Sequence, residues 1–391
     1  MKKKQDSVNN TEMGRRGFLK RTVLASAAIC IAPILEKVTA AEKSITGKSP
    51  VSATVFPVSI AAVRTQRTLG SGKAVFTVSA MGFGCMGLNH HRSQSPDEKA
   101  CTRLIHEAIE RGVTLFDTAE SYGYHKNEKL VGEALKGYAD RVFVSSKFGH
   151  KFVNGVRVNA EEDSTPSNIR RVCENSLRNL GVETLGMFYQ HRADPNTPIE
   201  VVAETVGELI KEGKILHWGI SETTEEYLRR AHRVCPVTAI QNRFSMMARW
   251  HEPLLPVVEE LGIGFVAHSP LANGLLTNRY TADTSFDPET DYRASMPQYR
   301  PESFEKNRAL FSLLEQLADE YRATASQISL AWMMNKHPAI IPIPGTRHLC
   351  RLKENIGAAD IHLTDEEVKA IDTALDAMEM SEVFGGSPIK K

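Results

Sequence analysis

The feature that most constrains the fold is a series of eight short apolar segments separated by longer amphipathic stretches. The segments are VSAMGFG (78–84), VTLFDTA (113–119), RVFVSSK (141–147), LGMFYQH (185–191), LHWGIS (216–221), VTAIQN (237–242), IGFVAHSP (263–270) and AIIPIPG (339–345). Because polar residues do not alternate within them, each predicts a strand buried on both faces, as in a parallel sheet covered by helices. Eight strand-helix units in a row predict an α/β fold, a closed (β/α)8 TIM barrel in a single domain.

An open doubly wound sheet is the alternative to the barrel. It would place a glycine-rich G-x-G-x-x-G turn after the first strand, opening directly into a helix. The stretch GFGCMG (82–87) has three glycines, but the next helix start is not found before Ser95. The barrel is therefore favoured.

Two of the intervening stretches carry helix-start signals. Ser95 is predicted as an N-cap, followed by Pro96 at the first helical position and by Glu98, which would complete a capping box. Thr197 and Pro198 repeat this arrangement. These signals place helices directly after the loops that follow the first and fourth strands.

The first forty residues differ from the rest of the chain. Three lysines and GRRGFLK (14–20) precede the mostly apolar TVLASAAICIAPIL (22–35), the order of an export signal. Arg15 and Arg16 resemble the twin-arginine signal, which exports folded proteins through the twin-arginine machinery, and cleavage is expected after Ala40. The apolar run is 14 residues long, whereas a spanning helix needs about 20, so no stable membrane anchor is expected.

These signals predict an exported, periplasmic protein of four segments: a signal peptide (1–40), a linker (41–66), the barrel (67–380) and a C-terminal tail (381–391). An ordinary secretory signal, an uncleaved tail, or a cytoplasmic protein with a vestigial signal are the alternatives. The 48 Lys and Arg residues nearly balance 47 Asp and Glu, which disfavours nucleic acid as a partner. Five scattered cysteines after the signal argue against a disulfide framework, and no metal site is predicted.

Polar side chains stand where the predicted strands end. Because the active site of such a barrel lies at the carboxyl ends of its strands, these side chains are expected on one rim. They are Asp117, Lys147, His191, Ser221, Gln241, His268 and Ser269. Individually an Asp at a strand end is often an N-cap, a lone His is often scaffolding and a Lys is often a surface residue. Together, on one rim, they indicate a single active site.

Tyr122 follows Asp117 by five residues. A free phenol has a pKa near ~10, and a neighbouring cation lowers it by stabilising phenolate. Lys147 is placed to supply the cation, and Asp117 to keep the buried ammonium charged. This predicts a tuned general acid, with His191 as a second donor that orients a carbonyl or assists the proton.

The motifs FDTAESYG, SSKFG, YQHR, and IPIPGT with ENIGA, in this order and spacing, resemble those of the aldo-keto reductases, and the likeness runs from about Arg67 to about Ala370. That family is a (β/α)8 barrel that binds NADPH in extended form and reduces aldehydes and ketones. The resemblance implies that Tyr122 is the proton donor and that Asp117, Lys147 and His191 complete a tetrad.

The resemblance also implies the residues that hold NADP(H), Asp117 among them. Gly84, Cys85 and Met86 would line it at the first strand, while Ser221 and Gln241 would bond the nicotinamide carboxamide. Ser269, Pro270, Leu271, Asn273 and Gly274 would clamp the pyrophosphate. Gly345, Thr346, Arg347 and Arg351 would hold the 2′-phosphate, because guanidiniums near a helix start suit it, and Glu354 and Asn355 would meet the adenine.

Two positions depart from the family. Glu222 stands where many members have Asn, and a carboxylate accepts hydrogen bonds but cannot donate them to a carboxamide. His268 stands where a Tyr usually stacks on the nicotinamide, and an imidazole is smaller and titrates near neutral pH.

The sequence thus predicts an exported NADP(H)-dependent oxidoreductase acting on a small carbonyl or alcohol substrate. The alternative is a nicotinamide-binding sensor or regulatory subunit with little turnover. Folded export suggests that the protein leaves the cytoplasm with NADP(H) bound and recycles it between two substrates. Four loop arginines, Arg92, Arg192, Arg293 and Arg300, hint at an anionic or polyhydroxylated substrate, although loop arginines are more often solvated.

Overall fold

The computed structural model describes residues 62–63, 65–70, 75–90 and 95–384. The predicted signal peptide, most of the predicted linker and Arg92 lie outside these described residues.

Eight parallel strands form one sheet in the order β12-β11-β10-β9-β8-β5-β4-β3. Their bounds are β3 (Phe83–Gly84), β4 (Leu115–Asp117), β5 (Phe143–Phe148), β8 (Leu185–Gln190), β9 (Ile215–Ser221), β10 (Ala239–Arg243), β11 (Gly264–His268) and β12 (Ile340–Pro342). The first and last strands are joined as well. The amide of Gly82 donates to Pro342 O at 2.9 Å, and that of Gly84 to Pro344 O at 3.4 Å. The sheet is therefore a closed barrel, as predicted, and not an open doubly wound sheet.

Two glycines permit this closure. A Cβ atom on Gly84 would lie 2.7 Å from Ile343 O, and one on Gly345 would lie 2.5 Å from Gly84 O. Both partners are backbone atoms that cannot rotate away, so any side chain would push the two chain segments apart. Gly84 and Gly345, which were predicted to contact the cofactor, are thus also needed for the close approach of the first and last strands.

An antiparallel hairpin of β1 (Gln66–Leu69) and β2 (Phe76–Ser79) closes the amino-terminal end of the barrel. Leu69 packs against Gly264 at the start of β11, and the ring of Phe76 stacks on Phe143 at the start of β5, with centroids 4.3 Å apart. The hairpin corrects one prediction: residues 78–84 are not one strand, because Val78 and Ser79 pair backwards with β1 while Phe83 and Gly84 enter the barrel.

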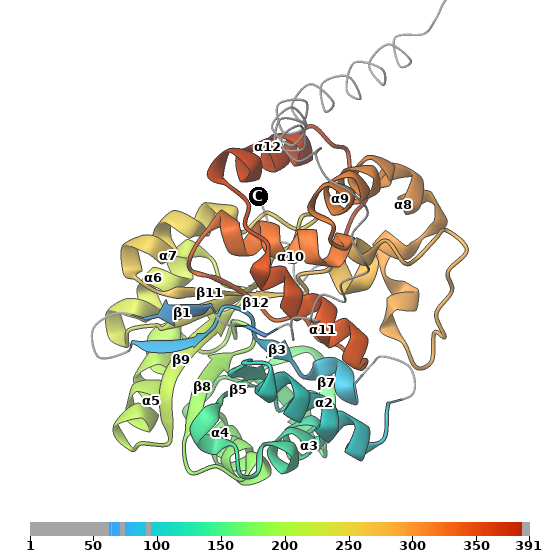
Figure 1. Cartoon of the computed structure of the whole chain (residues 1–391). Helices are drawn as coiled ribbons and strands as arrows, with labels where there is room; N and C mark the ends of the chain where they lie inside the picture. The colour runs from blue at the N-terminus through green and yellow to red at the C-terminus, as the bar shows by residue number, and fades with distance from the viewer. Residues whose placement is uncertain (1–61, 64, 71–74, 91–94, 385–391) are drawn as a thin grey trace, which may run out of the picture. The chain divides into compact units, whose positions relative to one another are not determined.

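Helices cover the outside of the strands (Figure 1). Those that follow the barrel strands are α2 (Glu98–Glu110), α3 (Lys126–Leu135), α4 (Pro166–Leu180), α5 (Ile199–Lys211), α6 (Glu225–Val234), α7 (Leu255–Leu261), α10 (Ala325–Lys336) and α11 (Leu349–Gly357). Two more, α8 (Pro301–Lys306) and α9 (Arg308–Tyr321), precede α10. The helix α12 (Asp365–Asp376) belongs to a separate compact unit, and Thr364 and Glu367 form its capping box.

Both predicted helix starts are wrong in detail. Asp97, not Ser95, caps α2, because its carboxylate accepts from the amide of Ala100 at 2.6 Å. At α5 the cap position falls on Pro198, and the hydroxyl of Thr197 donates to Asp194 at 2.8 Å instead. At α2 the carboxylate of Asp97 thus takes the capping role two residues after the predicted cap, whereas at α5 the cap position falls on a proline whose side chain forms no capping bond.

Additional segments rise above the carboxyl rim. A hairpin of β6 (His150–Val153) and β7 (Val156–Glu162) follows β5. Short 3-10 helices lie at Tyr292–Ser295 and Pro297–Tyr299, and a kinked 3-10 segment at Ala272–Thr277. Residues beyond Met380 also contribute, since the amide of Ser381 donates to Asn307 at 2.9 Å. None of the helices among the described residues has the length and apolar character to span a bilayer.

Candidate active site

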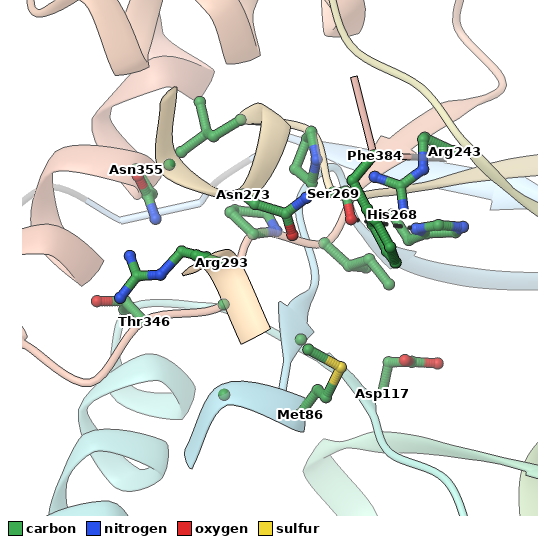
Figure 2. Close-up of a pocket in the computed structure, with 18 of the residues that line it drawn as sticks. Met86, Asp117, Arg243, His268, Ser269, Asn273, Arg293, Thr346, Asn355 and Phe384 are labelled. Atoms are coloured by element: carbon green, nitrogen blue, oxygen red, sulfur yellow. Dashed lines mark hydrogen bonds between the residues drawn. The ribbon is translucent and has the colours of Figure 1, made fainter. Parts of the chain in front are cut away.

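A cavity of about 440 Å³ opens at the carboxyl ends of the strands. In Figure 2, Asn355, Thr346 and Arg293 lie on the opposite side of the cavity from Asp117 and His268. Most of the predicted site residues line it: Gly84, Met86, Asp117, Tyr122, His191, Ser221, Gln241, His268, Ser269, Pro270, Leu271, Asn273, Gly274, Gly345, Thr346, Arg347, Arg351 and Asn355.

A buried ion pair forms the floor of this cavity. The Nζ atom of Lys147 lies 2.5 Å from Asp117 Oδ2, donates to Thr118 O at 2.8 Å, and donates to the hydroxyl of Tyr122 at 3.3 Å. The other carboxylate oxygen, Asp117 Oδ1, accepts from Ser145 Oγ at 2.8 Å. All three donor positions of the ammonium are thus in use, and one of them points at the phenol.

The loop that carries Tyr122 is fixed at both ends. Thr118 Oγ1 donates to Asn127 Oδ1 at 2.6 Å, and Asn127 Nδ2 donates to Cys85 O at 3.0 Å. Between these anchors Tyr124 and His125 have left-handed backbones, with φ of 45° and 70°. This tight return brings the phenol back over the end of β4, beside the lysine from β5.

The electrostatics of the pair follow from its burial. Burial alone would lower the pKa of Lys147, but the carboxylate of Asp117 outweighs it, so the pKa is raised and the ammonium stays charged. For Tyr122, burial raises the pKa and the charge of Lys147 lowers it, and burial is the stronger cause. The lysine acts in the expected direction, but the phenol keeps a pKa above its ordinary value and is protonated at neutral pH.

His191 faces the phenol ring, with centroids 6.0 Å apart, and its Nδ1 lies 3.4 Å from Ser121 Oγ. Behind it the ring of His150 lies 4.4 Å away, and His150 Nδ1 lies 2.5 Å from Glu162 Oε2 on the β6–β7 hairpin. Burial, followed by the neighbouring His150, lowers the pKa of His191 well below its usual range. His191 is therefore a neutral imidazole, which offers one N–H donor.

Ser221 and Gln241 end the adjacent strands β9 and β10. The side-chain amide of Gln241 donates to Asp117 Oδ1 at 2.9 Å, so it joins the ion pair. Ser221 Oγ accepts from Arg192 Nη1 at 3.3 Å. Both polar groups face the cavity beside the tetrad of Asp117, Tyr122, Lys147 and His191.

Glu222 and His268, the two departures from the family, bind each other. Glu222 has a left-handed backbone with φ of 55°, and its Oε1 lies 2.6 Å from His268 Nε2. The same oxygen accepts from the amide of Arg243 at 2.8 Å, while Oε2 lies 3.4 Å from His251 Nε2. Asn242 Nδ2 donates to the other nitrogen of His251, so that imidazole carries its proton toward Glu222.

This cluster sets the charge at the position that a tyrosine usually fills. Burial would raise the pKa of Glu222, but the hydrogen bonds from His251 and His268 outweigh it and hold that pKa well below its usual range. Burial lowers the pKa of His268 to about 4, although its bond to Glu222 acts in the opposite direction. At neutral pH His268 is therefore an uncharged donor to a carboxylate.

The segment after β11 turns sharply under the cavity. Ser269, Ala272 and Asn273 have φ of 52°, 47° and 61°, and Gly274 has φ of 106°. Tyr292 donates its hydroxyl to Asn273 Oδ1 at 3.1 Å from the long loop above. A run of left-handed residues presents successive backbone groups in a concave arrangement, which suits the oxygens of a pyrophosphate.

Basic and polar residues line the far side of the cavity at the start of α11. Arg347, Arg351 and Asn355 face it, as do Gly345 and Thr346. Two guanidiniums beside a helix start form the donor set that a phosphate monoester requires, so these residues fit the 2′-phosphate end of NADP(H).

Three predicted cofactor residues do not reach the cavity. Cys85 is fully buried, and Glu222 belongs to the imidazole cluster. Glu354 is not among the lining residues, and its carboxylate accepts from Arg279 at 2.7 Å and from Thr324 at 2.8 Å. Lys147 is also fully buried and acts only through its neighbours.

The sequence did not indicate ten further residues that line the cavity. They are Gly87, Arg243, Thr277, Tyr280, Tyr292, Ser326, Ile343, Pro344, His348 and Phe384. Arg243 could have been found, since it ends β10 as the other polar residues end their strands. Phe384 had no such signal, and it reaches the site from the predicted C-terminal tail, where the guanidinium of Arg243 lies 5.6 Å from its ring centroid.

Comparison with known proteins identifies this arrangement. Residues 80–376 match the model of the Aldo/keto reductase family. The chain belongs to the aldo/keto reductase family. A relative from Glycine max named "Probable aldo-keto reductase 1" is 35% identical over 320 residues, which cover 81% of this chain and 90% of the relative.

Solved structures of aldo/keto reductases have the same fold. A glycerol dehydrogenase from Gluconobacter oxydans is similar with a TM-score of 0.71 and 30% identity, over 80% of this chain and 96% of that chain. An aldo/keto reductase from Klebsiella pneumoniae, in complex with NADP and acetate, is similar with a TM-score of 0.61 and 25% identity, over 78% of this chain and 95% of that chain.

These matches confirm the predicted family, the barrel and the reaction class, an NADP(H)-dependent oxidoreduction of a carbonyl. They do not favour the alternative of a sensor without turnover. Among the described residues, no three His, Cys, Asp or Glu side chains are grouped as a metal site would require. The described cysteines are all free, four buried and Cys350 exposed.

Proposed function

We propose that this aldo/keto reductase reduces an aldehyde or ketone to an alcohol with Tyr122 as the proton donor. The observation that carries the proposal is the bond from Lys147 to the hydroxyl of Tyr122, 3.3 Å long, at the floor of the cavity. A phenol held beside a permanent cation is a general acid whose conjugate base is stabilised as it forms.

Each member of the tetrad has a distinct task. NADPH, when bound, supplies the hydride that reduces the carbonyl carbon. Tyr122 gives its proton to the carbonyl oxygen, and Lys147 stabilises the phenolate that remains. Asp117 keeps Lys147 charged, and neutral His191 donates a hydrogen bond that orients the oxygen. In alcohol oxidation the same phenolate accepts the proton.

The residues proposed to hold NADP(H) divide by chemistry. Ser221 and Gln241 are polar groups beside the tetrad and suit a carboxamide, whereas Arg347 and Arg351 suit the 2′-phosphate. His268 stands at the position for the nicotinamide ring as an uncharged imidazole, fixed by Glu222. A fixed, neutral ring supports stacking rather than charge repulsion of an oxidised nicotinamide.

Replacing Tyr122 by Phe tests the proton-donor role. Turnover, followed as NADPH absorbance with an aldehyde, should fall by about 10² to 10⁴-fold, because general acid catalysis contributes that much. The affinity for NADPH, followed by fluorescence, should hold. Tyr227→Phe is the matched control, since Tyr227 bonds Gln190 outside the cavity. Turnover in Tyr122→Phe equal to that of the control would refute the role.

We also propose that the protein is exported to the periplasm with NADP(H) already bound. Arg15 and Arg16, the apolar run behind them and the site for cleavage after Ala40 support the route. A bound cofactor would stabilise the folded chain that this route carries and would be recycled between two substrates.

Cell fractionation and nucleotide analysis test the export proposal. The full chain should appear in the periplasm, and the variant with Arg15→Lys and Arg16→Lys should stay in the cytoplasm. Denaturing the exported protein should release close to one nucleotide per chain. Equal distribution of the two chains would overturn the route, and an exported protein without nucleotide would overturn the recycling.

A further inference from the structure

Four loop arginines suggested an anionic substrate, and the structure describes three of them, Arg192, Arg293 and Arg300. Arg293 is bound to Asp291 by two hydrogen bonds of 2.9 and 2.6 Å, and it donates to Tyr280 at 2.9 Å. Arg300 is exposed at the start of α8. Arg192 follows the catalytic His191 and lines the cavity, unlike Arg300. Arg293 also lines the cavity, but its charge is paired with Asp291.

Arg192 is held in place by one of its two terminal nitrogens. Its Nη1 donates to His191 O at 2.5 Å and to Ser221 Oγ at 3.3 Å. A guanidinium has five N–H groups, so Nε and Nη2 keep about three for a ligand. Those two nitrogens form the edge that pairs with both oxygens of a carboxylate.

Within the described part of the chain, no carboxylate forms an ion pair with Arg192. Asp117 of the tetrad and Glu222, which bonds His268 at the cavity, already have partners. Asp117 is paired with Lys147, and Glu222 accepts from His268, His251 and the amide of Arg243. The charge of Arg192 helps to lower the pKa of Glu222, but the two side chains form no ion pair, so the guanidinium remains available to a ligand.

This charge acts at the centre of the site. After burial, Arg192 is among the causes that lower the pKa values of His191 and His268, and it also acts to lower that of Tyr122. Those three side chains come from three different strand ends and face one cavity. The guanidinium and the phenol of Tyr122 thus line the same cavity.

We propose that Arg192 binds a carboxylate of the substrate, so that the preferred substrates are oxo acids, carbonyl compounds that carry a carboxylate. The carboxylate pairs with Nε and Nη2, and the carbonyl oxygen of the same molecule lies at Tyr122. This inference rests on the proposed function, because it concerns the substrate of the same site. The rival role of Arg192 is to position Ser221 and the end of β8.

Matched acids and amides distinguish the two roles. The probes are glyoxylate, pyruvate and succinic semialdehyde, each compared with the amide in which the carboxylate is replaced by a neutral group of similar shape. Glyceraldehyde serves as a polyhydroxylated aldehyde. For the wild-type protein, kcat/KM should be at least about tenfold higher for one of the acids than for its amide, because the amide leaves the guanidinium unpaired.

Arg192→Gln keeps a donor for His191 O and Ser221 but removes the charge and the fork. The ratio of kcat/KM between acid and amide should fall by about 10- to 100-fold, chiefly through a higher KM for the acid. Arg192→Lys, a point charge without a fork, should recover only part of the ratio. Arg300→Gln, which changes an exposed arginine near the same rim, should leave the ratio unchanged.

Three outcomes would overturn the inference. The first is a wild-type protein that prefers amides or glyceraldehyde to every acid. The second is an Arg192→Gln variant that loses acid and amide activity equally. The third is an Arg300→Gln variant whose acid-to-amide ratio of kcat/KM falls as far as that of Arg192→Gln. The second outcome, joined with a raised KM for NADPH, would assign Arg192 to positioning Ser221. A wild-type protein that oxidises NADPH with none of the carbonyls would instead contradict the proposed function itself.

Discussion

The ion pair of Lys147 and Asp117 should be the most sensitive point of the site, and Asp117→Asn tests it. In this variant the ammonium remains fully buried but has only neutral acceptors, the amide oxygen of Asn in place of the carboxylate together with Thr118 O at 2.8 Å and Tyr122 at 3.3 Å. A buried charge without a counter-charge is unfavourable, so the folded state loses free energy or the lysine loses its proton.

The magnitude follows from the geometry. Two unit charges 2.5 Å apart attract by about 7 kcal/mol at an effective dielectric constant of about 20, and burying both charges offsets a large part of this. Removing one partner of such a pair typically costs about 3 to 5 kcal/mol. We expect the free energy of unfolding of Asp117→Asn to fall by that amount.

Urea denaturation of the wild type, Asp117→Asn, Lys147→Met and the double variant measures the coupling between the two residues. The double variant removes both charges, so its loss should be smaller than the sum of the single losses by about 3 kcal/mol. Ser145→Ala is the control, because it removes a single hydrogen bond to Asp117 and should cost about 1 kcal/mol. Single losses that add within about 0.5 kcal/mol would refute the coupling.

Two further predictions concern the scaffold. Gly345→Ala should destabilise the barrel by about 1 to 3 kcal/mol, because the new Cβ would lie 2.5 Å from Gly84 O. The control Gly207→Ala in α5 should be neutral or stabilising, because its Cβ would lie 3.5 Å from the nearest atom. Equal unfolding midpoints in urea for the two variants would contradict this. Burial raises the pKa of Glu120 to about 7 from 4.5. As the pH rises from 4.5 to 7, the free energy of unfolding of the wild type should therefore fall by about 3 kcal/mol relative to that of Glu120→Gln. A difference between the two proteins that stays constant from about pH 4 to 8 would exclude this.

The arrangement of the tetrad followed from sequence because it depends on topology alone. In a parallel barrel every strand ends on the same rim, so Asp117, Lys147 and His191 had to converge once eight strands were recognised. The exact partners of each group did not follow, because hydrogen bonds depend on distances between strands. The side-chain amide of Gln241 bonds Asp117 across 124 residues of sequence.

The net pKa of Tyr122 illustrates a second limit. The sequence indicates which charge stands beside the phenol, but not how deeply the ring lies in the cavity. Burial outweighs the ammonium of Lys147 in the structure, so the direction of the shift is opposite to the one expected from the charge alone. Desolvation is a property of the packed site, and no local motif contains it.

By itself the sequence determined the barrel, the strand ends that carry chemistry, the family and the departures at Glu222 and His268. Only the tertiary structure showed that Glu222 and His268 form a hydrogen-bonded pair. Glu222 follows β9 and His268 ends β11, and these strands lie on either side of β10. The left-handed backbone at Glu222 brings its carboxylate to within 2.6 Å of the imidazole. It also left Arg192 without a carboxylate of its own among the described residues, because packing had already assigned the nearby acids to other partners.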